Sequence, residues 1–76
     1  MKIKILGSGC GKCKTLAENA QTALTHLGLE AEIIKVTDYA EIAAHGVMST
    51  PALVIDDKVV SVGKVLLSSE IEKLLH

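Results

Sequence analysis

Apolar and polar residues follow two different periods along this chain, which predict short strands separated by helices. The first apolar run, residues 3–6, is rich in isoleucine and stops at Gly7, so it is typical of a strand. Over residues 10–27 the apolar positions recur at about 100° per residue, which is the period of an α-helix. Gly28 is a suitable residue to end that helix.

The later runs predict three more strands and two more helices. In order, they are a strand over 31–36, a short helix from Asp38 to Gly46, strands over 52–55 and 59–62 and a last helix capped by Ser68 or Ser69. Asp38 is suited to cap the short helix, and Asp56 and Asp57 are suited to turn the chain. The order β-α-β-α-β-β-α predicts an α/β fold. We expect a four-stranded mixed sheet with three helices on both faces, its first two strands parallel and its last two a hairpin.

Length and composition limit the possible functions. A chain of 76 residues makes one domain, 1–76, and 49% hydrophobic residues supply the dense core that such a small domain needs. Tyr39 is the only aromatic residue and the net charge is -1, so neither stacking platforms nor a basic surface for nucleic acid is expected. The apolar runs are too short for a membrane span or a secretory signal. We therefore expect a cytoplasmic protein with no membrane or nucleic-acid partner.

Two cysteines carry the candidate chemistry. Cys10 and Cys13 stand three residues apart at the start of the first predicted helix. The helix N-terminus and the positive charge of Lys12 both favour a thiolate, which is the form that attacks disulfides. Cys13 falls in the apolar arc of the helix, whereas Cys10 lies at its edge. The periodicity therefore predicts an accessible Cys10 that attacks and a buried Cys13 that resolves the mixed disulfide.

The same pair has two other interpretations. It could be a structural disulfide, although the cytoplasm disfavours one, or it could hold a soft metal such as Cu(I). Small copper chaperones also place Cys-x-x-Cys after a first strand, but their chains end in a strand. Here the last segment is a predicted helix, and Pro51 precedes the third strand. Both features favour redox chemistry over a copper-binding module.

Residues 7–13 (GSGCGKC) together with 49–54 (STPALV) resemble the very small thioredoxin-like proteins often called redox-active disulfide protein 2. The resemblance implies a thioredoxin fold and a dithiol–disulfide activity that needs no cofactor and acts on protein disulfides. It also implies a cis peptide bond before Pro51, which would lie against the cysteine pair. The Thr50 backbone would then dock a substrate chain as an added strand. By analogy, the candidate electron donor is a flavin-dependent thioredoxin reductase.

Three positions depart from thioredoxin itself. Gly9 replaces the tryptophan before the first cysteine, and Lys12 replaces the proline before the second. Lys4 stands near the place where thioredoxin carries a buried acid that assists proton transfer. These differences bear on the reduction potential and on which proteins the pair serves.

Overall fold

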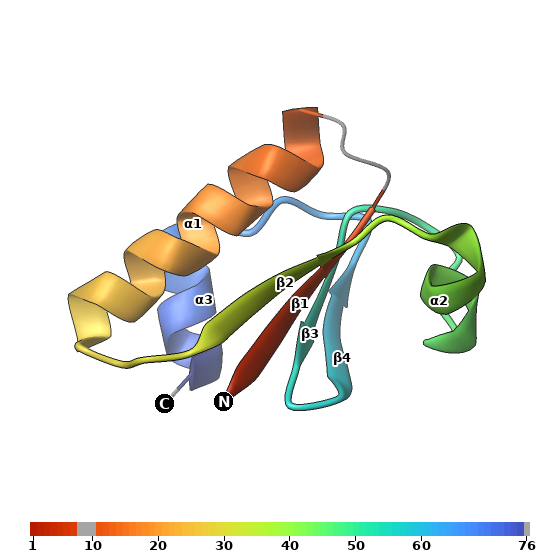
Figure 1. Cartoon of the computed structure of the whole chain (residues 1–76). Helices are drawn as coiled ribbons and strands as arrows, with labels where there is room; N and C mark the ends of the chain where they lie inside the picture. The colour runs from red at the N-terminus through yellow and green to blue at the C-terminus, as the bar shows by residue number, and fades with distance from the viewer. Residues whose placement is uncertain (8–10, 76) are drawn as a thin grey trace.

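The helices and strands follow one another in the order that the sequence predicts (Figure 1). The computed structural model describes residues 1–7 and 11–75. The elements are β1 (Lys2–Leu6), α1 (Gly11–Leu27), β2 (Glu32–Val36), α2 (Tyr39–Ala44), β3 (Ala52–Ile55), β4 (Lys58–Val62) and α3 (Ser68–Leu75). Within the described residues, no helix combines the length and apolar character that crossing a membrane requires.

The strands form one mixed sheet in the order β2-β1-β3-β4. β1 pairs in parallel with β2, and β3 runs antiparallel to both β1 and β4. The predicted parallel pair and the predicted hairpin are therefore both confirmed. Asp56 and Asp57 form the hairpin turn with φ values of 48° and 66°. Aspartate is one of the few residues other than glycine that adopts this left-handed conformation.

The two faces of the sheet carry separate apolar clusters, because successive residues of a strand point to opposite sides. Ile3, Ile5 and Leu53 face α1 and α3. Leu6 and Val54 belong to a second cluster, which Ile42 of α2 joins. Figure 1 shows α1 and α3 together on one side of the sheet, with α2 apart from them at one end. The prediction of helices on both faces is confirmed.

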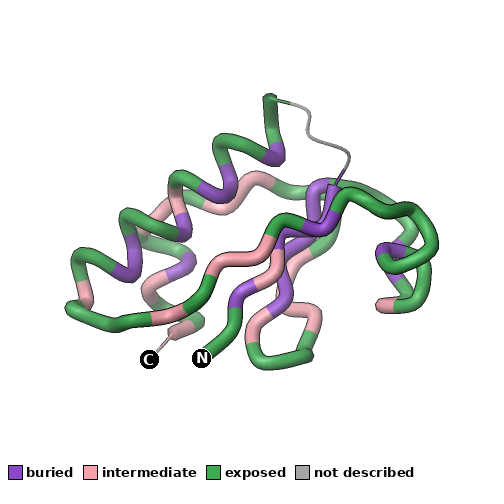
Figure 2. Tube along the Cα trace, viewed as in Figure 1, coloured by how far each residue is buried: buried purple, intermediate pink, exposed green. Residues whose placement is uncertain are grey.

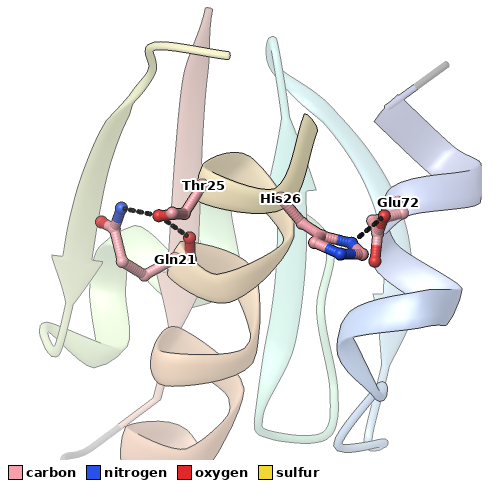
Figure 3. Close-up of polar contacts among 4 residues, drawn as sticks. All are labelled: Gln21, Thr25, His26 and Glu72. Carbon is pink, nitrogen blue, oxygen red and sulfur yellow. Dashed lines mark hydrogen bonds and ion pairs between the residues drawn. The ribbon is translucent and has the colours of Figure 1, made fainter. Parts of the chain in front are cut away.

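Helix α1 supplies most of the first cluster. Its buried residues are Cys13, Leu16, Ala17, Ala20, Ala23 and Leu24, and they recur along one side of the helix (Figure 2). Three small alanines let the helix approach the sheet closely. Two polar contacts connect α1 to the C-terminal segment. In the first, Asn19 Nδ2 donates to the Leu66 carbonyl at 2.8 Å. His26 Nδ1 lies 3.0 Å from Glu72 Oε1 on α3 (Figure 3).

Acidic side chains cap the two shorter helices. The Asp38 carboxylate accepts a hydrogen bond from the Ala40 N–H at 2.9 Å, as the sequence predicts. In α3 the cap differs from the expected serine. Ser68 is already the first helical residue, and the Glu70 carboxylate accepts from the N–H of Leu67 at 3.1 Å. This contact occupies a donor at the helix start that would otherwise have no partner in the helix.

The packing of α3 generates a stability prediction. Ile71 is fully buried against the first cluster, whereas Leu74 on the same helix is 44% exposed. Ile71→Ala should lower the free energy of unfolding by about 2–5 kcal/mol, because it removes buried methyl groups and leaves a cavity. Leu74→Ala, the matched control, should cost less than about 1 kcal/mol. Denaturant unfolding measures both, and equal losses would contradict this packing.

Candidate functional site

The candidate site lies where β1 ends and α1 begins. Gly7 follows the last residue of β1, and its N–H donates to the Val36 carbonyl at 2.9 Å, which extends the pairing with β2. Cys13 lies in the first turn of α1 and is 6% exposed. Its predicted burial is therefore confirmed. The sequence folds this way because the apolar arc of α1 begins at Cys13 and must be covered by the sheet.

Gly7 touches both Cys13 and the loop that precedes β3. A methyl group placed on Gly7 would overlap Cys13 Sγ. It would also lie 3.4 Å from Cys13 Cβ and 3.7 Å from Thr50 Cβ. The space that a side chain would fill at position 7 is thus occupied by the sulfur of Cys13. Only glycine permits this approach of sulfur to backbone.

The loop before β3 forms the other wall of the site. The Thr50–Pro51 peptide bond is cis, Pro51 is buried and Thr50 is exposed. Gly63 stabilises this loop through a hydrogen bond, in which its N–H donates to the Pro51 carbonyl at 2.8 Å. At φ +70°, Gly63 leaves only 3.3 Å between an added Cβ and the Ser49 Cβ, so a side chain there would be both strained and crowded.

The structure brings some of the residues that the sequence singles out close together, and one of them lies outside the described part of the chain. Cys13 and Thr50 come together around Gly7, and Lys12 is exposed in the first turn of α1. Cys10 lies outside the described residues, so its predicted exposure and its pairing with Cys13 stay predictions. Among the residues that the structure describes, no three histidine, cysteine or acidic side chains gather as a metal site.

Lys4 belongs to β1, but its side chain is turned away from Cys13. It lies on the face of the sheet opposite Cys13, and its Nζ is 3.6 Å from Asp57 Oδ1. The alternation of strand residues explains this orientation, since Ile5 and not Lys4 shares a face with α1. An apolar residue therefore stands next to Cys13 on β1.

Sequence reasoning missed three residues near Cys13. Gly7 is expected to end a strand and to open the motif over 7–13, but its contact with Cys13 is not predicted, and Lys35 and Thr37 are not singled out. All three line a cavity beside Cys13. The signal for Lys35 is its register: it pairs with Ile5 across the parallel strands and so lies on the same face. The close approach at Gly7 has no sequence signal beyond the presence of glycine.

Gly7→Ala tests the contact between Gly7 and the sulfur. The added methyl group must displace Cys13 Sγ, so we expect the free energy of unfolding to fall by about 1–3 kcal/mol, as overpacking does elsewhere. In a Cys13→Ala background the sulfur is absent, and the same change should cost much less. Denaturant unfolding of the wild type, the two single variants and the double variant gives the coupling free energy between Gly7 and the Cys13 sulfur.

Gly11→Ala is the matched control for that experiment. A methyl group on Gly11 would meet no atom within 4 Å, although Gly11 belongs to the same motif as Gly7. Alanine favours helix over glycine, so this change should be neutral or slightly stabilising. An equal loss from Gly7→Ala with and without the Cys13 sulfur would show that the contact does not set the cost.

Comparison with known proteins agrees with this geometry. A family model described as a thioredoxin domain matches residues 1–76. A thioredoxin from Methanothermobacter thermautotrophicus is 37% identical over 75 residues, which cover 99% of this chain and 97% of that protein. A thioredoxin from Methanocaldococcus jannaschii is 45% identical over 73 residues, covering 96% of this chain and 84% of that one. With a thioredoxin-like fold and matches along its whole length, the chain belongs to the thioredoxin family of thiol–disulfide oxidoreductases.

Proposed function

We propose that this protein transfers electrons to or from protein disulfides through a reversible Cys10–Cys13 dithiol/disulfide. The observation that carries the proposal is the setting of Cys13. Cys13 is buried in the first turn of α1, and its sulfur packs against Gly7. The side chain of Thr50 lies near the same glycine. A helix start beside a loop with an exposed threonine is suited to thiol exchange, because it combines a stabilised thiolate with a place for the client chain.

The proposed reaction has two exchange steps. The Cys10 thiolate attacks one sulfur of the client disulfide, forms a mixed disulfide and releases the other client sulfur as a thiolate. The Cys13 thiolate then attacks Cys10 Sγ, which forms the Cys10–Cys13 disulfide and releases the second client thiolate. Both electrons pass from the cysteine pair to the client sulfurs, so no bound cofactor is required. The reverse sequence oxidises a client dithiol.

Lys12 and Thr50 have supporting roles in this proposal. Helix α1 is 17 residues long, and the positive end of its dipole and the nearby Lys12 ammonium both favour a Cys10 thiolate. Thr50 is exposed beside buried Pro51. Its backbone groups would pair with an extended client segment, as in other cases of strand addition. Such pairing holds the client disulfide near the cysteines without selecting its side chains.

The proposed partners follow from the same chemistry. The matched relatives are named thioredoxins, and we propose protein disulfides as the clients of this chain. The proposed electron donor is a flavin-dependent thioredoxin reductase. We place the reaction in the cytoplasm, where a reducing environment keeps the pair ready to donate electrons.

A soft-metal module is not favoured. The family match and both relatives are thioredoxins. Small copper chaperones have the order β-α-β-β-α-β, whereas the described elements here have the order β-α-β-α-β-β-α. Both observations support electron transfer over metal delivery.

Single cysteine variants test the roles assigned to the two sulfurs. Cys13→Ser should accumulate a stable mixed disulfide with a reducible client, because nothing remains to resolve the Cys10 adduct. Cys10→Ser should accumulate little, since Cys13 is buried. Mass spectrometry after alkylation measures the trapped adducts. Stable adducts in Cys10→Ser and none in Cys13→Ser would reverse the roles. Adducts in neither variant would contradict the function.

A further inference from the structure

A groove of about 550 Å³ lies between β4 and α3. Its volume falls in the range of about 300–1,000 Å³ that is usual for ligand sites. Within the described residues β4 pairs with β3 alone, so it is an edge strand of the sheet (Figure 1). The outer N–H and C=O groups of an edge strand are free to pair with another chain. The groove therefore combines an open strand edge with the side chains of α3.

Apolar side chains line the groove from both elements. Val62 of β4 is 42% exposed and Leu74 of α3 is 44% exposed. Val60 and Leu66 also line it, and both pack against the apolar cluster that joins the sheet to α1 and α3. Exposed apolar side chains that gather in one place are typical of sites where another molecule binds. This lining suits an apolar group of a ligand.

A buried hydroxyl group without a partner belongs to the same lining. Among the residues that the structure describes, the Oγ of Ser61 is buried and makes no hydrogen bond. A buried polar group that lacks a partner costs stability, so its presence needs an explanation. Ser61 as a whole is partly exposed. A rotation about its Cα–Cβ bond would turn the hydroxyl into the groove, where a polar group of a ligand could bond to it.

The charged residues of the groove favour a carboxylate. Lys64 and Lys73 are exposed and line it. Within the described part of the chain, neither lysine has a carboxylate within ion-pair distance. Glu70 also lines the groove, but its carboxylate already accepts a hydrogen bond from the Leu67 N–H at 3.1 Å. Two ammonium groups are therefore available to a negative charge in the groove.

One end of the groove adjoins the loop that carries Thr50. Gly63 stands between two lining residues, and its N–H donates to the Pro51 carbonyl at 2.8 Å. The groove also lies on the face of the sheet that α1 and α3 cover, which is the face of Cys13. An extended chain advances about 3.3 Å per residue. A client held at Thr50 would therefore reach Lys64 within a few residues.

We propose that this groove receives an extended segment of the client next to its disulfide. A large apolar side chain of the segment lies against Val62 and Leu74, and a carboxylate lies between Lys64 and Lys73. The backbone of the segment pairs with the outer edge of β4 as an added strand, and Ser61 hydrogen-bonds to it. This inference rests on the proposed function and names its client class, which is disulfides flanked by apolar and acidic residues.

The test uses two peptides that each carry one cysteine as a thiopyridyl disulfide. Leucine and aspartate alternate on both sides of the cysteine in one peptide, and glycine and serine in the other. Attack by reduced protein releases thiopyridone, whose absorbance gives a second-order rate constant. Dithiothreitol, a small uncharged dithiol, corrects for the intrinsic reactivity of each peptide. We expect the wild type to prefer the leucine–aspartate peptide by about tenfold, which corresponds to about 1.4 kcal/mol.

Variants of the groove should reduce this preference. Leu74→Ala removes the apolar contact, and Lys64→Gln with Lys73→Gln removes the charges; each should lower the preference about threefold. Ser61→Ala should also lower it. In the free protein, however, Ser61→Ala should raise the denaturation midpoint, because it removes a buried polar group that has no partner there.

Two matched controls should keep the wild-type preference. Leu67→Ala truncates a leucine that is 62% exposed but does not line the groove. Lys58→Gln removes an exposed lysine at the hairpin end of β4, also outside the groove. A loss of preference in the controls equal to that in the groove variants would overturn the inference.

The remaining outcomes separate this inference from the proposed function. Equal reactivity of the two peptides with the wild type would overturn the inference and leave the function, since both peptides are still reduced. A dimer that Leu74→Ala dissociates would assign the groove to a second copy of the chain and overturn the inference as well. A wild type that reacts with neither peptide would overturn the proposed function together with the inference.

Discussion

The site depends on the contact between the Cys13 sulfur and the backbone of Gly7. The end of β1 and the first turn of α1 must approach until the sulfur fills the space of the missing side chain. Other features serve this approach. Alanines along the buried side of α1 keep the helix close to the sheet, and the bond from Gly7 to Val36 fixes the glycine against β2. The loop at Thr50 then meets the same glycine from β3.

The sheet supports this end of the molecule from both faces. Ile5 and Leu53 pack beneath α1, while Leu6 and Val54 pack on the α2 side. Polar contacts hold the opposite end of β1, where the Lys2 N–H donates to Asp56 Oδ1 at 2.9 Å and Lys4 pairs with Asp57. The hairpin aspartates therefore have a structural role, and the second face has no part in the chemistry proposed for Cys13.

The sequence predicted the fold well because its signals are local. Glycines end the strands and helices, Asp38 caps α2, and the apolar arc of α1 correctly placed Cys13 in the core. The site was harder to predict because it depends on contacts between distant segments. Lys35 comes close to Cys13 only through the register of β2 against β1. Lys4, one residue from Ile5, lies on the other face of the sheet, because successive residues of a strand point to opposite sides.

Our central claim is that Cys10 and Cys13 form one reversible redox couple. An equilibrium titration of the protein in thiol–disulfide buffers of stepped potential, read by alkylation and mass spectrometry, tests it most directly. The account predicts a single two-electron transition with a slope of about 30 mV per decade, which disappears when either cysteine becomes serine. Cysteines that stay reduced at every potential, together with tight stoichiometric Cu(I) binding, would contradict it and favour metal delivery.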